Sequence, residues 1–383
     1  MLWKKRVNFD GAAGIRGNPS SPHEGGRRAK KTLEDARTAI ARLLEVQSDD
    51  VVFTSGATEA NALAILGHVR ALRVLAGPDT AGRNNMHVLY LSSAHASVVE
   101  NMKLLEEEGI AIEPLPIRDW RVDTEMLTKM IRPETVLVSM DAVCGETGVV
   151  WNTREVAEAL RKARSGGAAS RVLLHVDASQ APSTQKITRD HFGADLLTLD
   201  ASKVGPMRGM GALIAHRTIP IIPLYRGGGQ ERGLRPGTEA PELAQQFSVA
   251  LATAVFGRDA FRTSAARNRE LLVKAIMKDV PNVQVNEGRM QAPNILNLSL
   301  SGRDTDYLVA LLDEAGFAVS TRSACETDSE EGSRAVFALT GDQNRARSTL
   351  RISWGTRVSS RDSARFVRAL AEAVAFVDKS SHG

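Results

Sequence analysis

Short apolar runs alternate with longer amphipathic segments between about residue 50 and residue 215. This alternation predicts strands joined by helices, and therefore an α/β fold in which helices cover a mostly parallel sheet. Apolar residues recur at helical spacing over residues 33–44 and 156–163, which predicts two of the covering helices. The strands are expected at residues 51–53, 87–91, 135–139, 171–176, 196–199 and 211–214.

The pattern after residue 240 predicts a smaller unit of mixed α and β structure. Helices are expected at residues 241–266 and 304–315, and strands at residues 294–299, 318–321 and 349–353. The last helix has its apolar residues on one face, and Ser359 stands three residues before Asp362 at its start, as in a capping box. We expect residues 11–255 to form the large domain and residues 256–383, with residues 1–10, to form the small one.

Composition agrees with two globular domains, because the chain has 383 residues, of which 43% are hydrophobic and 25% charged. The net charge of +4 is spread among acidic residues, so we expect a solvated surface and no direct binding of nucleic acid. Cys144 and Cys325 are the only cysteines, which fits a reducing compartment. The sequence shows no apolar signal segment or membrane span, and we predict a cytoplasmic protein without a metal site.

Two chemical groups follow neighbouring apolar runs. Asp177 closes the run at residues 172–177, and Lys203 follows the run at residues 196–199. In an open α/β sheet both groups would face the crevice at the carboxyl ends of the strands. Pyridoxal phosphate needs such a pair: a lysine to hold its aldehyde and a carboxylate to keep its ring nitrogen protonated. Either residue alone is commonly an ordinary surface or strand-end residue, so this interpretation depends on the rest of the site.

Other segments could complete the site. The turn at residues 53–59 follows a strand and opens a helix, so its free N–H groups and the Thr58 hydroxyl could bind a phosphate. His95 follows the next strand, where its imidazole could stack on a pyridine ring and move protons. Gln180 stands three residues after Asp177, near enough to reach the same ligand.

Three features of the second half add to this interpretation. The glycine-rich segment 225–238 cannot be a regular helix or strand, and its basic residues could complete an anion site. Arg351 lies in a predicted strand, and its planar guanidinium suits the carboxylate of an amino acid. Cys325 precedes an acidic stretch and is placed as a nucleophile, whereas Cys144 lies beside an apolar strand and is expected to be inert.

Taken together, these segments resemble the group I cysteine desulfurases, which are class V aminotransferases of pyridoxal phosphate fold type I. The resemblance covers nearly the whole chain and depends on residues 18–21, 53–59, 175–180, 203, 227–238, 320–325 and 351–353. It implies a large cofactor-binding domain with a mostly parallel seven-stranded sheet between helices. It also implies a smaller C-terminal α+β domain that carries the loop with the catalytic cysteine.

The resemblance assigns the following roles. Lys203 holds the cofactor, Asp177 pairs with its ring nitrogen, Gln180 contacts its phenolic oxygen, and His95 stacks on its face and takes part in catalysis. The phosphate is bound by Ala57, Thr58, Ser202 and, from the second subunit of a homodimer, Thr238. Arg351 binds the carboxylate of L-cysteine. The thiolate of Cys325 takes the sulfur as a persulfide, and alanine leaves.

The chain departs from the family pattern in four places. Only residues 14–17 separate two N-terminal motifs that are usually further apart. Cys144-Gly145-Glu146 replaces Asn-Asn-Glu and removes an amide from the cofactor site, and Asp200 replaces a serine where a carboxylate would repel phosphate unless it turns away or is paired. The loop after Cys325 is slightly short and contains the acidic residues Glu326, Asp328, Glu330 and Glu331. We therefore predict a specialised desulfurase that is slower or tuned to a particular acceptor and that retains its cofactor weakly.

Two alternatives remain open from the sequence. A selenocysteine lyase or another class V enzyme would use the same lysine, carboxylate and arginine. A catalytically weak homologue could instead serve as a scaffold in a sulfur-transfer complex. The sequence does not identify the sulfur acceptor, because iron-sulfur cluster assembly, thiolation of transfer RNA and sulfur modification of DNA all begin with such a persulfide.

Overall fold

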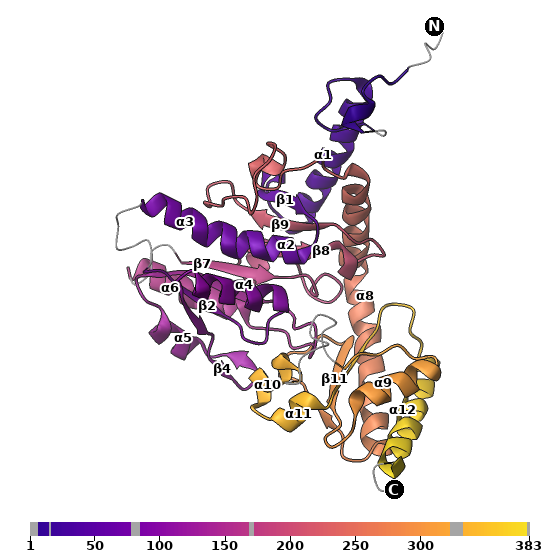
Figure 1. Cartoon of the computed structure of the whole chain (residues 1–383). Coiled ribbons are helices and arrows are strands. Elements are labelled where there is room, and N and C mark those ends of the chain that lie inside the picture. The colour runs from indigo at the N-terminus through magenta and orange to yellow at the C-terminus, as the bar shows by residue number, and fades with distance from the viewer. Residues whose placement is uncertain (1–6, 15–16, 78–84, 168–171, 322–331, 381–383) are drawn as a thin grey trace.

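The structure is a computed structural model that describes residues 7–14, 17–77, 85–167, 172–321 and 332–380. Its buried apolar side chains form two clusters. The larger cluster surrounds a seven-stranded sheet, and the smaller one lies beneath a three-stranded sheet near the C-terminus. Figure 1 shows the two units one above the other, with the long helix α8 (Pro241–Asp279) running from the first into the second.

The large sheet has the strand order β1-β9-β8-β7-β6-β2-β3. All strands run parallel except β9, which is antiparallel to both of its neighbours. Their bounds are β1 (Val51–Thr54), β2 (His87–Tyr90), β3 (Ala111–Pro114), β6 (Thr135–Asp141), β7 (Leu173–Asp177), β8 (Leu196–Asp200) and β9 (Gly211–Ala215). The expected α/β fold with a mostly parallel seven-stranded sheet is confirmed.

All six strands expected in this region are present, although Arg171, where one was expected to begin, lies outside the described residues. The pattern missed β3, which lies at the edge of the sheet. Its residues are exposed or half-buried and it ends in Pro114, so it lacks the apolar run that marks the inner strands.

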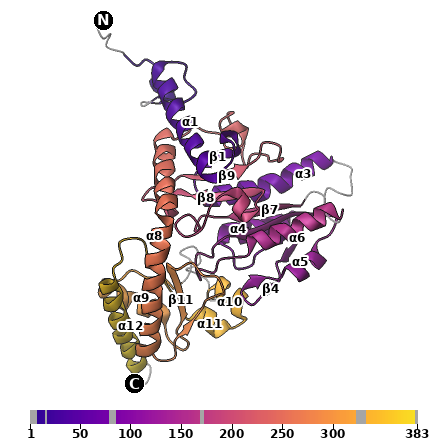
Figure 2. The ribbon, with the colours of Figure 1, turned by 180° about the vertical axis from the view of Figure 1, so that it is seen from behind.

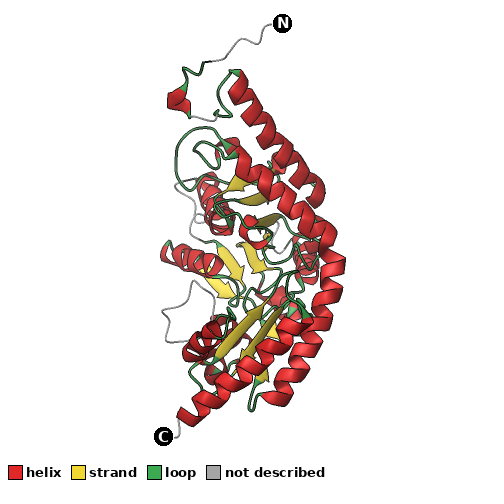
Figure 3. Ribbon diagram, turned by 90° about the vertical axis from the view of Figure 1, so that its right-hand side faces the viewer, coloured by secondary structure: helices red, strands yellow, loops and turns green. Residues whose placement is uncertain are grey.

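Helices pack around the sheet, and Figure 3 shows the strands between them. They are α1 (Glu24–Leu44), α2 (Ala57–Ala62), α3 (His68–Ala76), α4 (Ala96–Glu107), α5 (Thr124–Met130), α6 (Thr153–Ser165) and the short α7 (Arg189–Phe192). A π-helical segment, Leu63–Gly67, joins α2 to α3 without a break. The two predicted helices are α1, which buries Leu33, Ala36, Ile40 and Leu44, and α6.

The second unit has an antiparallel sheet of β10 (Gln284–Val285), β11 (Ile295–Ser299) and β12 (Thr349–Ser353). Its helices are α9 (Thr305–Glu314), α10 (Arg334–Thr340), α11 (Gln343–Arg347) and α12 (Ser360–Ser380). Viewed from behind in Figure 2, α8, α9 and α12 lie together in this unit. The capping box of α12 is confirmed, because the Ser359 backbone N–H donates to the Asp362 carboxylate and the Asp362 N–H donates to the Ser359 hydroxyl.

Two expectations for this part of the chain were wrong in detail. Residues 318–321 were expected to form a strand, but they contribute only an isolated bridge between Ser320 and Arg351. The helix expected at residues 241–266 continues to Asp279, because Leu272 and Ile276 bury themselves in the second cluster beyond a polar stretch.

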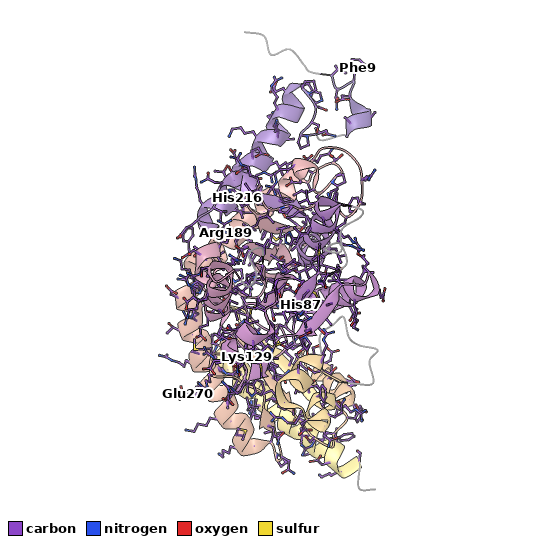
Figure 4. The ribbon with its side chains drawn as sticks, turned by 90° about the vertical axis from the view of Figure 1, so that its left-hand side faces the viewer. Phe9, His87, Lys129, Arg189, His216 and Glu270 are labelled. Atoms are coloured by element: carbon purple, nitrogen blue, oxygen red, sulfur yellow. The ribbon has the colours of Figure 1, made fainter. Side chains whose placement is uncertain are left out.

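The division into domains at residue 255 stays a prediction, because α8 crosses it without a break. Leu251 belongs to the first cluster and Leu272 to the second. Asp10 lies at the start of α1, where it accepts a hydrogen bond from Ser21 and contacts His23. Phe9, 95% exposed, lies near the N-terminal end of the molecule in Figure 4. Among the described residues, none of the helices is long and apolar enough to cross a membrane.

Candidate active site

A cavity of about 280 Å³ opens at the carboxyl ends of the parallel strands. Seven of the predicted site residues line it: Ala57, Thr58, His95, Asp177, Gln180, Lys203 and Arg351. Ser202 lines an adjoining cavity that shares Lys203 and Arg351 with the first. Thr238 is not among the residues that line either cavity, and Cys325 lies outside the described residues. The fold thus gathers side chains from the ends of several strands, where α/β sheets hold their ligands.

The carboxylate of Asp177 is held in place at the end of β7. It is buried, and one of its oxygens accepts a hydrogen bond from the backbone N–H of Ser179 at 2.9 Å. The other accepts from the side-chain amide of Asn61 at 2.7 Å. Both donors fix the carboxylate at the edge of the sheet, where it would face a protonated ring nitrogen.

Asn61 links this carboxylate to His95. Its side-chain amide also donates to the hydroxyl of Ser97 at 2.8 Å, and that hydroxyl lies 2.8 Å from Nδ1 of His95. The backbone N–H of Ser97 donates to the same Nδ1 at 3.2 Å. Because Nδ1 accepts, the proton of the neutral imidazole is on Nε2.

A second carboxylate lies beside the first. Asp141 closes β6 and is the register partner of Asp177 on β7, so both side chains lie at the same edge of the sheet and line the cavity. Burial, reinforced by the charge of Asp177, raises the pKa of Asp141 to about 8. One carboxylate of the pair is thus protonated near neutral pH, as expected for like charges forced close together.

The sequence analysis missed Asn61 and Asp141. Asn61 is a polar residue on the buried face of a helix, and Asp141 is an acid at the end of an apolar run. Both features were readable in the sequence. Each required knowing which strand or helix is its neighbour, which only the fold supplies.

Three buried oxygen atoms in residues that line the cavity make no hydrogen bond to a described residue. Asp141 Oδ1, Ser93 Oγ and Ser179 Oγ have no hydrogen-bond partner among the described residues, although all three residues line the cavity. Unpartnered buried polar atoms are costly in a protein interior. Their convergence on one cavity is typical of a site built to bind a polar ligand.

The side chain of Gln180 lies against Gly145, which stands where the family pattern has an asparagine. A Cβ atom added at Gly145 would lie 3.3 Å from Nε2 of Gln180, so the glycine leaves room for that side chain. The departure from the family pattern at residue 145 therefore does not leave an open space. An amide from the other side of the cavity lies against it.

The turn expected to bind phosphate already holds a carboxylate. The backbone N–H of Ala57, at the start of α2, donates to Oδ2 of Asp200 at 3.0 Å. The backbone N–H of Ser202 donates to Oδ1 of Asp200 at 2.7 Å. The Asp200 side chain therefore points into the turn rather than away from it, and its pairing partners are N–H groups rather than a cation.

Arg351 reaches the cavity from β12 of the second unit. Its Nη1 donates to the backbone carbonyl of Gly145 at 3.3 Å, and its backbone exchanges hydrogen bonds with Ser320. Ser333, just beyond the next undescribed segment, donates to the buried carboxylate of Glu146 at 2.6 Å. The described chain on both sides of residues 322–331, which include Cys325, is therefore anchored beside the cavity.

The glycine-rich segment is fixed to the large sheet through Glu231. Its carboxylate accepts from Nη1 and Nη2 of Arg37 on α1, each at 2.7 Å, and from the backbone N–H of Phe53 on β1 at 2.8 Å. This buried ion pair fixes the position of the segment that precedes Thr238. It lies next to the strand that feeds the turn at residues 55–58.

Comparisons with known proteins agree with this arrangement. The family model "Aminotransferase class-V" matches residues 12–366. Cysteine desulfurase IscS 1 of Archaeoglobus fulgidus is 32% identical over 357 residues, which cover 92% of this chain and 88% of that protein. A solved NifS-like protein has a TM-score of 0.84 at 26% identity, covering 94% of this chain and 92% of its own. SspA in complex with cysteine has a TM-score of 0.72 at 27% identity, covering 88% and 91%. The chain belongs to the class V aminotransferase family and, within it, to the cysteine desulfurases.

Proposed function

We propose that this cavity converts L-cysteine to L-alanine with the help of pyridoxal phosphate, and that Cys325 receives the sulfur as a persulfide. The observation that carries the proposal is the convergence of Lys203, Asp177 and Arg351 on one cavity in a class V fold. The relative SspA, which binds cysteine, supports the choice of substrate.

The residues at the ring end of the cavity fit the cofactor. Asp177 is a buried carboxylate held by two N–H donors, and Lys203 faces the same space without a hydrogen bond to a described residue. The unpartnered oxygens of Ser93 and Ser179 offer further hydrogen bonds. When bound, the cofactor supplies an electron-withdrawing ring that stabilises negative charge on the substrate's α-carbon.

The chain's own groups have distinct tasks in this proposal. The Lys203 amine would hold the cofactor and, when free, could take the α-proton of the substrate. Asp177 would pair with the protonated ring nitrogen, and His95, whose Nδ1 accepts from the backbone N–H of Ser97, would stack on the ring. Arg351 orients the substrate through its carboxylate. Ala57, Thr58 and Ser202 are the proposed contacts of the phosphate once it displaces the Asp200 carboxylate from the N–H groups of Ala57 and Ser202. Gln180 is the proposed contact of the phenolic oxygen.

Sulfur transfer is the task of Cys325. Its thiolate attacks the sulfur of the substrate, so an S–S bond forms while the C–S bond breaks and its electron pair stays on carbon. That carbon then takes up a proton, the α-proton held by Lys203 returns to the α-carbon, and the product leaves as alanine. Cys144 is unsuited to this task, since burial raises its pKa to about 12 and keeps it a thiol.

We also propose that the chain acts as a homodimer and passes its sulfur to an acceptor protein. Thr238 does not line the cavity of its own chain, which agrees with a role in the cavity of a second copy. Sedimentation should then give twice the chain mass of 41.3 kDa. A single-chain mass at assay concentration would count against a shared site. A cytoplasmic location remains part of the proposal and can be checked by cell fractionation.

Mass spectrometry of peptides tests the sulfur acceptor on the enzyme. After incubation with L-cysteine, the peptide with Cys325 should gain one sulfur atom, and the peptide with buried Cys144 should not. Lys203→Ala should abolish the gain. A selenocysteine lyase that does not transfer sulfur to the enzyme would leave Cys325 unmodified, and that result would overturn the proposed route.

A further inference from the structure

We infer that the carboxylate of Asp200 occupies the place of the cofactor's phosphate, so that this chain gains little affinity from the phosphate group. The inference rests on the proposed function, because it concerns the same cofactor at the same cavity. It assigns Asp200 as the residue that determines which form of the cofactor the site accepts.

The hydrogen bonds of Asp200 support this assignment. Its two oxygens accept from the N–H groups of Ala57 and Ser202, at 3.0 and 2.7 Å. A Cβ atom added at Gly56 would lie 3.5 Å from Oδ2, so the carboxylate lies directly against the turn. Such N–H groups at the start of a helix are what a phosphate would bind. The helix is long enough to matter, because α2 continues through Leu63–Gly67 and α3 to Ala76.

A second carboxylate takes another N–H of the same turn. The backbone N–H of Ser55 donates to Glu59 at 2.5 Å. Burial alone would raise the pKa of Glu59, but the hydrogen bonds from Ser55, the charge of Arg235 and the hydroxyl of Tyr225 lower it overall. Glu59 is therefore ionised, and its charge is balanced by an ion pair with Arg235 and a hydrogen bond from the Tyr225 hydroxyl.

Asp200 differs from Glu59, because no cation of the described residues forms an ion pair with it. The described residues offer it no salt-bridge partner, and its contacts are the two backbone N–H groups. A phosphate entering the turn would have to displace the carboxylate from both donors, and the displaced negative charge would remain nearby. Pyridoxal, which lacks the phosphate, requires no such displacement.

The test compares the two forms of the cofactor in matched variants. Dissociation constants for pyridoxal phosphate and for pyridoxal are measured from the visible absorbance of the lysine-bound cofactor in the full-length protein. Asp200→Ser removes the charge and supplies a hydroxyl that can donate to phosphate. Asp342→Ser is the control, because Asp342 caps α11 through the N–H groups of Asn344 and Arg345, away from the cavity.

We expect Asp200→Ser to bind pyridoxal phosphate at least about tenfold more tightly than the wild type, while its affinity for pyridoxal changes less than about threefold. Asp342→Ser should change neither value. Equal affinities of the wild type and Asp200→Ser for pyridoxal phosphate would overturn the inference. An equal gain in affinity for pyridoxal phosphate and for pyridoxal would also overturn it, since the effect of Asp200 would then not depend on the phosphate group.

Inorganic phosphate provides a readout that does not depend on the cofactor's aldehyde. Phosphate should raise the melting temperature of Asp200→Ser more than that of the wild type, since a ligand stabilises the state it binds. If Lys203 takes up neither form of the cofactor in any variant, the proposed function fails, and the phosphate titration still decides the role of Asp200. If Asp200→Ser does not fold, Asp200→Asn removes the charge with the shape kept, and the same gain in phosphate affinity is expected.

Discussion

Two hydrogen bonds from one amide join the Asp177 carboxylate to the Ser97 hydroxyl. Asn61→Leu keeps the size of the side chain and removes both donors. We expect the free energy of unfolding to fall by about 1–3 kcal/mol, because a buried carboxylate oxygen loses its partner. Urea unfolding measures this loss. The exposed Asn344→Leu should cost under about 0.5 kcal/mol, and equal losses for the two variants would contradict the account.

The contact between Asn61 and Asp177 also predicts an effect on activity. Asn61 positions Asp177 and, through Ser97, His95, so Asn61→Leu should lower kcat and change the pH profile of kcat. Asn61→Gln, which keeps the amide, should recover part of the loss. A purely structural residue would lower the amount of folded protein and leave the pH profile of the folded fraction unchanged.

Asp141 makes stability depend on pH in an unusual direction. Burial and the charge of Asp177 raise its pKa from the ordinary value of 3.8 to about 8, so the folded state keeps a proton that the unfolded chain has lost. The contribution of Asp141 to the free energy of unfolding is therefore full below pH 3.8, where both states are protonated. It is lost as the pH rises to about 8. Asp141→Asn should therefore gain stability relative to the wild type between pH 5 and pH 8, by on the order of a few kcal/mol. A difference that is constant over this range would contradict the raised pKa.

The sequence was sufficient for residues whose chemistry stands at the end of a recognisable strand. Asp177 and Lys203 were expected at one crevice for this reason, and the structure brings them together with Arg351 in one cavity. The direction of the Asp200 carboxylate could not be predicted. Its alternatives differ by a rotation of one side chain, and the donors come from residues 57 and 202.

At the level of elements, the Arg37–Glu231 pair ties the glycine-rich segment to α1 and β1. Glu231→Gln should destabilise the fold by about 3–5 kcal/mol, because a buried charge loses its partner. Glu34→Gln is the matched control, since Glu34 also contacts Arg37 but its side chain is 48% exposed. It should cost under about 1 kcal/mol by urea unfolding. Similar losses for both variants would show that burial is not the deciding factor.

Elements with a strong apolar signal were predictable, and those defined by their neighbours were not. The inner strands β6, β7, β8 and β9 are buried and were found from the sequence. The edge strand β3 and the full length of α8 were missed. Residues 318–321 begin with apolar residues that favour a strand, but only Ser320 pairs with β12. Strand propensity alone was therefore misleading where little neighbouring strand is available for pairing.

At the scale of the whole molecule, the cavity lies where the two units meet. Asn297 of β11 donates to the backbone carbonyl of Glu146, Ser333 to its carboxylate, and Arg351 to the carbonyl of Gly145. The loop at residues 143–149 is thus held by the second unit while it lines the cavity of the first. Movement of one unit would reposition the proposed carboxylate-binding arginine against Lys203 and Asp177.

The central claim is that this cavity releases alanine from L-cysteine through Lys203 and passes the sulfur to Cys325. The most direct measurement is alanine and sulfide formed by cofactor-saturated wild type, Lys203→Ala and Cys325→Ala in the presence of a thiol reductant. We expect equal amounts of alanine and sulfide from the wild type, and the loss of both products in the two variants. Alanine formation that is unchanged in both variants would contradict the account.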